Sequence, residues 1–241
     1  MRDNKLAPVL AIVGGAIVLV VALVVANQIS GNSKKTSAYN ITIGSINEML
    51  NGIPQKGIEL GNPKAKVTVV ELADPQCQAC GDFGRNTLPS LIQDYVRTGK
   101  VRIEYRGLHF VDNFVKNGPK DSARLLRLAE AAGLQKKLWN IVELEYENQG
   151  AENSGYATDA FLRGIAEAVP ELNADKALAA ADTNVVVPNI DAAKALADKS
   201  FKQLSTPSFL IGPTGGKPSK TIVGAQALSV FVKAIDAELR K

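Results

Sequence analysis

The two cysteines of the chain stand in a single Cys-x-x-Cys motif, Cys77-Gln78-Ala79-Cys80. The motif follows a predicted strand and opens a predicted helix, where free backbone N–H groups and the helix dipole stabilise a thiolate. Thiolates are the attacking species in thiol–disulfide exchange, and such motifs reach cysteine pKa values of about 3.5–7.5. We therefore expect Cys77, at the exposed helix start, to be the nucleophile and Cys80, one turn later, to be the resolving thiol.

Two other uses of the cysteine pair remain open but are less favoured. A zinc site needs about four ligands, and the chain adds to its two cysteines only one distant histidine, His109. A purely structural disulfide would close a very small loop and would constrain the unfolded chain little. We expect no metal site, and we expect redox exchange at this motif.

The residues around the motif predict a βαβ unit. The run KVTVVEL, residues 66–72, is almost continuously apolar, as in a strand buried on both faces. Apolar residues at helical spacing continue from the motif to Val96, with a kink expected at Pro89. A second strand is predicted at VRIEY, residues 101–105. A right-handed crossover between parallel strands is expected.

The next hundred residues predict helices alone. Residues 122–147 carry one apolar stripe at helical spacing, which we interpret as one helix. Further alanine-rich helices are expected at 159–168, 173–182 and 189–200, with Asp159, Asn173 and Asn189 as N-caps. The pattern indicates a helical subdomain inserted between strands.

The C-terminal part returns to strand and helix. Two apolar runs, SFLIG at 208–212 and KTIVG at 220–224, flank a Gly-rich turn and predict a β-hairpin. Residues 227–239 predict an amphipathic closing helix.

A long uncharged segment precedes this domain. Residues 8–26 are 19 apolar and small residues, and a helix of that length rises about 28 Å, close to the ~30 Å of a bilayer core. We predict a cytoplasmic N-terminus at 1–7, a transmembrane anchor at 8–26 and a flexible linker at 27–38. A cleaved secretory signal is the main alternative, although its apolar region is normally ~7–15 residues. A helix buried in the core of a soluble protein is a less favoured alternative.

Composition excludes several function classes. The 28 basic and 24 acidic residues give a formal net charge of +4, and this mixture of signs argues against a nucleic-acid-binding surface. A hydrophobic share of 46% is that of a globular protein and excludes collagen-like and disordered chains.

From Gly57 to its end, the sequence resembles the DsbA-like branch of the thioredoxin superfamily, which are exported disulfide oxidoreductases with a helical insertion. The matching segments are LGNPKAKVTVVELADPQCQAC, TLPSL, TGKVRIEYR, AEAAGLQKKLWN, ENQG and STPSFLIG, in this order. The resemblance implies a thioredoxin-like α/β fold for residues 39–241, with the inserted helical subdomain at about 117–202.

The resemblance also implies roles for residues away from the cysteines. Pro207 matches a cis-proline beside the active cysteines, and Glu71 matches a buried acid beneath them. Glu71 would then accept the proton of the resolving thiol, whereas a strand residue pointing to solvent is the alternative. Gln78, Ala79, Thr206 and Pro207 are expected to contact the substrate.

The chain departs from the family at one informative place. The proteobacterial prototype has Pro-His between its cysteines, whereas this chain has Gln78-Ala79. Because that histidine helps to stabilise the thiolate, we expect a weaker oxidant here. Thr206 occupies a position that varies in the superfamily and affects substrate release.

The resemblance implies that the Cys77-Cys80 disulfide oxidises paired cysteines of exported proteins without a bound cofactor. A membrane reoxidase resembling DsbB or vitamin K epoxide reductase would restore the disulfide. We expect a monomer held by its anchor, with the catalytic domain on the extracytoplasmic side of the cell membrane and no nucleic-acid partner. The alternatives are a reductase or isomerase of the cell envelope, and a redox-inert peptide-binding module.

Overall fold

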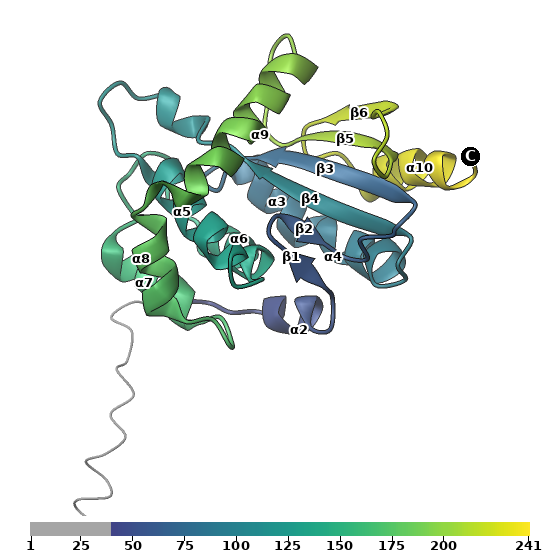
Figure 1. The fold of residues 1–241 in the computed structure, drawn as a ribbon. Helices are drawn as coiled ribbons and strands as arrows, with labels where there is room; N and C mark the ends of the chain where they lie inside the picture. The colour runs from purple at the N-terminus through teal and green to yellow at the C-terminus, as the bar shows by residue number, and fades with distance from the viewer. Residues whose placement is uncertain (1–39) are drawn as a thin grey trace, which may run out of the picture. The chain divides into compact units, whose positions relative to one another are not determined.

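A mixed six-stranded sheet with the order β1-β2-β4-β3-β5-β6 forms the centre of the computed structural model, which describes residues 40–241 (Figure 1). The strands are β1 Gln55–Lys56, β2 Glu59–Leu60, β3 Val67–Ala73, β4 Val101–Gly107, β5 Ser208–Pro213 and β6 Lys220–Val223. Strands β3 and β4 are parallel, and the other neighbouring pairs are antiparallel. The parallel pair and the β5–β6 hairpin confirm the predicted strand pattern.

The helices cover both faces of this sheet (Figure 1). They are α2 Ile46–Leu50, α3 Gln78–Asn86, α4 Leu88–Leu91, α5 Asp121–Gly133, α6 Leu138–Glu147, α7 Asp159–Glu167, α8 Ala174–Ala181, α9 Val187–Ser200 and α10 Leu228–Leu239. Short irregular turns are the π-helical η1 Ile92–Val96 and the 3-10 helices η2 Val111–Asn113 and η3 Asn184–Val186. Helices α5 to α9 lie between β4 and β5 in the chain and are the predicted helical insertion.

The central strand β3 is buried on both faces, as its continuous apolar run predicted. Val67, Val69 and Ala73 belong to the larger core, which also includes side chains of α3, α5, α6 and α10. Leu72 belongs to a smaller core beneath α9, with Val70 packed against it. Alternation along a strand therefore directs Glu71 toward the larger core.

The helix that follows the motif is interrupted where a kink was predicted. Helix α3 ends at Asn86, and α4 begins at Leu88 with Pro89 in its first turn. Proline has no N–H to donate to a preceding helical carbonyl and fits a first turn well.

The prediction of one helix over residues 122–147 is wrong. The chain reverses between α5 and α6 at residues 134–137, where Lys136 has a φ of 62°, and the two helices pack against each other. The apolar stripe misled because both helices turn their apolar faces into the same core, with Leu128 and Trp139 both completely buried.

Two of the three predicted N-caps are also wrong. Asn173 caps α8 as expected, accepting from the N–H of Lys176. Helix α7 is capped by Thr158 rather than Asp159. Helix α9 already begins at Val187, so Asn189 lies inside it and donates to Glu130 Oε2 at 2.7 Å.

The β1–β2 hairpin was not predicted, because strands of two residues carry no readable periodicity. It extends the sheet beyond β4, and its loop carbonyl of Ile58 accepts from the N–H of Tyr105 and from Trp139 Nε1. Trp139 is a completely buried core residue.

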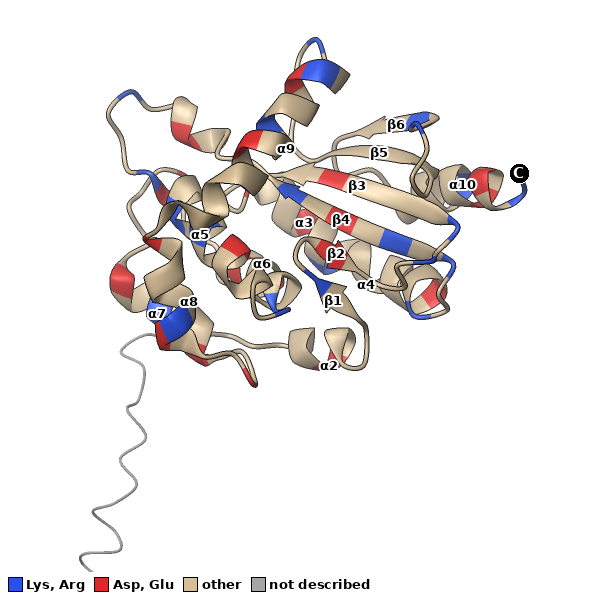
Figure 2. Ribbon diagram, in the orientation of Figure 1, with Lys and Arg blue, Asp and Glu red and all other residues tan. Residues whose placement is uncertain are grey.

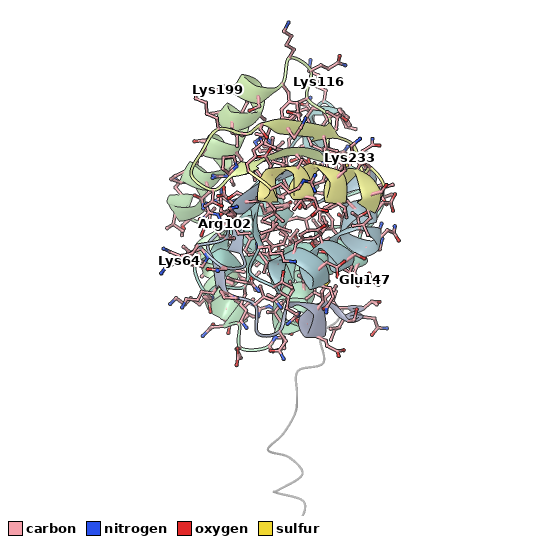
Figure 3. The ribbon with its side chains drawn as sticks, turned by 90° about the vertical axis from the view of Figure 1, so that its right-hand side faces the viewer. Lys64, Arg102, Lys116, Glu147, Lys199 and Lys233 are labelled. Carbon is pink, nitrogen blue, oxygen red and sulfur yellow. The ribbon has the colours of Figure 1, made fainter. Side chains whose placement is uncertain are left out.

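The largest core joins the sheet to α3 and α10 through aromatic rings. Phe83 lies 4.6 Å from Phe209 and 5.2 Å from Phe231 between ring centroids. Side chains fill this interior (Figure 3). Basic and acidic residues are interspersed along the described chain (Figure 2).

The predicted N-terminal segment 1–7, anchor 8–26 and linker 27–38 lie outside the described residues, and they stay predictions. Within residues 40–241, the helices are too short or too polar to span a bilayer.

Candidate active site

The cysteine motif lies where β3 ends and α3 begins. Cys77 is the N-cap residue of α3, and its carbonyl accepts from the N–H groups of Cys80 and Gly81 at 3.0 and 3.1 Å. Both cysteines are free thiols in this structure. Both cysteines are buried, so the prediction of an exposed Cys77 is wrong, because the chain around the first turn of α3 packs over it. Cys77 retains 7% of its exposure and Cys80 none, so Cys77 is the less buried of the two.

The loop before β5 meets the motif although 129 residues separate them. The Thr206-Pro207 peptide bond is cis, as the resemblance implied. The carbonyl of Thr206 accepts from Cys77 Sγ at 3.4 Å. The carbonyl of Pro207 accepts from the N–H of Gly224 at 2.8 Å, which fixes the loop against the end of β6. Thr206 and Pro207 thus lie beside the reactive sulfur.

The two thiols have opposite pKa shifts. The hydrogen bond from the Cys80 thiol is the largest cause that lowers the pKa of Cys77 to about 7. A hydrogen bond from the Thr206 side chain lowers it further, against the opposing effect of burial. Burial is the main cause that raises the pKa of Cys80 well above its usual value. The pair is therefore a thiolate-forming sulfur next to one that keeps its proton.

Glu71 lies in the interior and does not point to solvent. Its exposed fraction is 1%, and its Oε1 has no hydrogen-bond partner. Burial, the nearby Glu143 carboxyl and Cys77 all raise the pKa of Glu71 well above its usual value, in that order. Glu71 also influences Cys80, so it is placed as a buried acid near the resolving thiol.

The two residues between the cysteines differ in exposure. Gln78 is exposed, and its Nε2 donates to the carbonyl of Gly150 at 3.3 Å. Ala79 is half-buried and packs against the core. The loop after α6 therefore borders the motif on the side of the insertion.

A buried polar network next to Cys77 was missed from the sequence. The Asp74 carboxylate accepts from the N–H of Gln76, from Ser122 Oγ and from the N–H of Val111 at 2.7–2.8 Å. Gln76 Nε2 in turn donates to Asp112 Oδ1 and to Ser122 Oγ. The only signal in the sequence is a polar run before the motif, which by itself predicts no more than the end of a strand.

Asp74 also acts on the electrostatics of the site. Burial is the main cause that raises its pKa to about 6, against the lowering effect of its three hydrogen bonds. Its negative charge opposes the thiolate of Cys77. His109 is exposed in the loop after β4, where its carbonyl accepts from Asn113 Nδ2 at 3.4 Å.

This geometry defines a thioredoxin-fold dithiol centre. A family model described as thioredoxin matches residues 54–236, and the chain belongs to this family. It is 30% identical over 179 residues to a "Probable disulfide bond formation protein D" of Bacillus cereus, covering 73% of this chain and 74% of that protein. A protein of the same name from Bacillus anthracis is 27% identical over 177 residues.

Solved structures show the same fold. BdbD from Bacillus subtilis aligns with a TM-score of 0.64 at 19% identity, covering 78% of this chain and 98% of BdbD. Alpha-DsbA1 from Wolbachia pipientis aligns with a TM-score of 0.61 at 22% identity, covering 81% and 96%. The DsbA-like thioredoxin fold with a helical insertion is therefore shown for this chain.

The depressed pKa of Cys77 predicts a pH-dependent stability of the reduced protein. Because the pKa falls from 9.0 to about 7 on folding, this stabilisation is present above the unfolded pKa and is lost as pH falls through about 7. As the pH rises from about 6 to about 8.5, the free energy of unfolding of the reduced form should increase by about 1–2 kcal/mol relative to that of the oxidised form. Above that range, ionisation of Cys80 in the unfolded chain offsets the gain.

Denaturant unfolding of both forms of the domain measures this difference. The oxidised form is the matched control because it retains Asp74 and Glu71 but has no thiol. A reduced form that loses stability relative to the oxidised form over this range would contradict a stabilised Cys77 thiolate.

Proposed function

We propose that the protein introduces disulfide bonds into exported proteins as a protein thiol:disulfide oxidoreductase. The observation that carries this function is the pair of opposite pKa shifts, with Cys77 ready to be a thiolate and Cys80 buried beneath it. The names of the two Bacillus relatives support the same activity. A redox-inert peptide-binding module would not need a depressed cysteine pKa.

The reaction begins from the Cys77-Cys80 disulfide. A substrate thiolate attacks Cys77 Sγ, the bond between the two enzyme sulfurs breaks, and Cys80 leaves. The second substrate thiolate then attacks the substrate sulfur of the mixed disulfide and expels Cys77 as a thiolate. The substrate is oxidised to a disulfide, and the enzyme is reduced to a dithiol. The low pKa of Cys77 makes it a good leaving group in the last step.

Glu71 supplies the proton that this cycle requires in the interior. When Cys80 leaves as a buried thiolate, a protonated Glu71 donates to it, because burial favours the neutral form of both groups. In the reverse direction, which reoxidation uses, the Cys80 thiol returns its proton to Glu71 as it attacks. The role of proton acceptor that the resemblance implies for Glu71 therefore applies to the reoxidation of the enzyme.

The direction of electron flow follows from the same pKa difference. A thiolate stabilised in the reduced protein makes the disulfide easier to reduce, and therefore oxidising. The unfolding comparison of the two redox forms tests this direction. A more stable oxidised form at neutral pH would favour the rival reductase or isomerase function.

The proposed cycle needs no bound cofactor beyond the Cys77-Cys80 disulfide. It does need an electron acceptor, for which a membrane oxidase resembling DsbB or vitamin K epoxide reductase is our proposal. We place the monomeric catalytic domain outside the cytoplasmic membrane, held by the anchor predicted at residues 8–26. Gln78, Ala79, Thr206 and Pro207 are the proposed substrate contacts.

Cys80→Ser should trap partner proteins as mixed disulfides, because the Cys77 thiolate can still attack a disulfide of a partner and expel one partner thiolate, whereas no Cys80 thiol remains to attack the mixed disulfide and release the partner. Cys77→Ser should trap few partner proteins, because Cys80 is completely buried and its raised pKa keeps the thiol protonated. Non-reducing gels of cells that express each variant measure the trapped complexes. The opposite pattern would exchange the roles of the two thiols.

Glu71→Gln should slow reduction of the enzyme disulfide by dithiothreitol by about 100-fold, in the range of lost general acid–base catalysis. The pH profile should also change, which a purely structural role would not produce. Glu145→Gln is the matched control, because Glu145 is also completely buried with both carboxyl oxygens unpartnered. Equal slowing in both variants, with unchanged pH profiles, would remove the role of Glu71.

If residues 8–26 remain attached as an anchor, the mature protein should sediment with membranes and resist carbonate extraction. N-terminal sequencing of the exported protein distinguishes the alternative. A soluble form that begins near Asn27 would identify the segment as a cleaved signal.

A further inference from the structure

We propose that a small apolar pocket between the loop after β4 and helix α9 receives one apolar side chain of the substrate, a few residues from the cysteine that reacts with Cys77. This inference rests on the proposed function, and it adds a specificity site on the side of the helical insertion. The pocket would make oxidation faster for cysteines that have a leucine-like or phenylalanine-like neighbour.

The pocket has the size and the lining of a side-chain subsite. Its volume is about 210 Å³, below the roughly 300–1,000 Å³ of small-molecule sites. Its apolar lining residues are Leu108, Phe110, Ile190, Ala197 and Leu204, and its polar ones are His109, Asn113, Lys194 and Asp198. Lys194 and Asp198 form an ion pair at 2.6 Å, so these two charges neutralise each other at the rim. An uncharged apolar group therefore fits this pocket best.

One wall of the pocket is tied to the segment that carries Cys77. Phe110 directly precedes the turn η2 and Asn113 is its last residue, and the N–H of Val111 in this turn donates to Asp74 Oδ2 at 2.8 Å. Gln76, the residue before Cys77, donates to Asp112 in the same turn at 3.0 Å. These buried contacts fix the wall relative to the reactive sulfur.

The other wall continues into the loop that contacts Cys77. Leu204 lines the pocket and precedes Thr206 by two residues, and the Thr206 carbonyl lies 3.4 Å from Cys77 Sγ. An extended peptide advances about 3.3 Å per residue. A substrate bound through its cysteine to Cys77 would therefore reach the pocket within a few residues.

The apolar surface extends from the pocket outward. The ring of Phe110 contacts that of Phe114 edge to face at a centroid distance of 5.1 Å. Phe114 is 62% exposed and the adjacent Val115 43%. The loop that carries them lies at the same end of the molecule as the C-terminal end of α9 (Figure 1), and the labelled Lys116 and Lys199 mark that end in Figure 3. Clustered exposed apolar side chains indicate a binding surface.

The occupant we assign is an extended segment of a reduced substrate protein. The contacts of both walls with the segment of Cys77 favour this occupant, because they hold the pocket within a few residues' reach of a chain that reacts at Cys77. The competing site for the same segment is a second apolar surface, with the exposed Val223 at the end of β6 and Val230 on α10.

A peptide series tests the subsite with the intact catalytic domain. Each peptide has two cysteines in a serine-rich background, and one leucine is moved through about four positions on either side of the first cysteine. The rate of peptide oxidation should rise about tenfold for a leucine at one or two positions, since one buried apolar group discriminates by about 10–200-fold. Equal rates for all peptides would overturn the subsite.

Variants of the protein then test which surface causes the preference for the leucine peptide. Leu204→Ser and Phe110→Ala should each reduce the ratio between the preferred leucine peptide and the all-serine peptide toward 1, and this ratio cancels general effects on the disulfide. Leu134→Ser is the matched control, because this leucine is 59% exposed in the turn between α5 and α6 and does not line the pocket. Loss of the preference in Val223→Ser or Val230→Ser instead would overturn the assignment.

Reduction of the enzyme disulfide by dithiothreitol separates the two proposals. Normal reduction by dithiothreitol together with equal peptide rates would refute the subsite and leave the proposed function standing. Failure to react with either the peptides or dithiothreitol would refute the proposed function itself.

Discussion

The difference in burial between two neighbouring sulfurs is the constraint on which the site depends. The Cys80 thiol hydrogen-bonds the Cys77 sulfur and contributes most to lowering its pKa to about 7. Cys80 itself is completely buried, and the loss of hydration keeps it protonated. One sulfur can therefore attack or leave as a thiolate, while the other holds its proton. Exposure of Cys80 to water would abolish its raised pKa, because burial is the main cause that keeps this thiol protonated.

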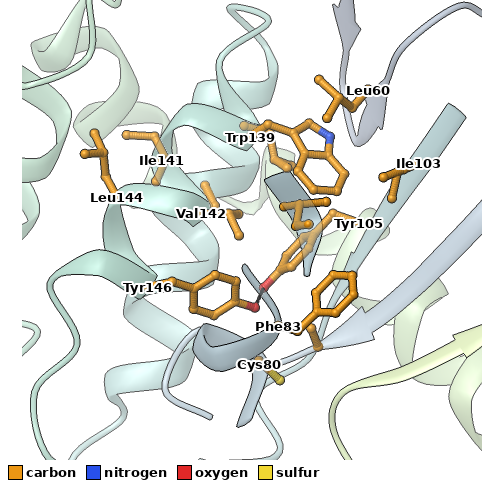
Figure 4. Packing of buried hydrophobic residues seen from close by; sticks show 14 of the residues in the cluster. Leu60, Cys80, Phe83, Ile103, Tyr105, Trp139, Ile141, Val142, Leu144 and Tyr146 are labelled. Atoms are coloured by element: carbon orange, nitrogen blue, oxygen red, sulfur yellow. Dashed lines mark hydrogen bonds between the residues drawn. The ribbon is translucent and has the colours of Figure 1, made fainter. Parts of the chain in front are cut away.

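The helical insertion provides much of that burial. Helix α6 packs against α3, and Tyr146 from α6 approaches Tyr105 from β4 near Cys80 (Figure 4), with 3.4 Å between their hydroxyl oxygens. After α6, Gln149 Nε2 donates to the carbonyls of Pro75 and Cys77 at 2.9 and 3.0 Å. The insertion is thus a structural part of the redox centre, since it closes the core beneath the cysteines and holds the chain on both sides of the motif.

The buried acids near the motif illustrate how hydrogen bonds decide between charge and neutrality. Asp74 and Glu71 are both almost completely buried, and burial raises the pKa of each. Three donated hydrogen bonds hold the pKa of Asp74 to about 6. Glu71 Oε1 has no donor, and the Glu143 carboxyl lies nearby, so its protonated form is favoured. The two acids therefore differ, because Asp74 accepts hydrogen bonds from the backbone around Cys77, whereas the protonated form of Glu71 agrees with the proton transfer that we propose for it.

Local patterns in the sequence determined the motif, the strands of the βαβ unit, the final hairpin and the closing helix, because periodicity reports which side of each element is buried. The sequence alone did not determine the reversal at residues 134–137, since both helices turn apolar residues into one core. It also did not reveal the hydrogen bonds that Ser122 donates to Asp74 and that Cys77 donates to Thr206, whose partners lie 48 and 129 residues apart. Only the tertiary structure decides such contacts, because a hydrogen bond or a loss of hydration depends on which segments the topology brings together.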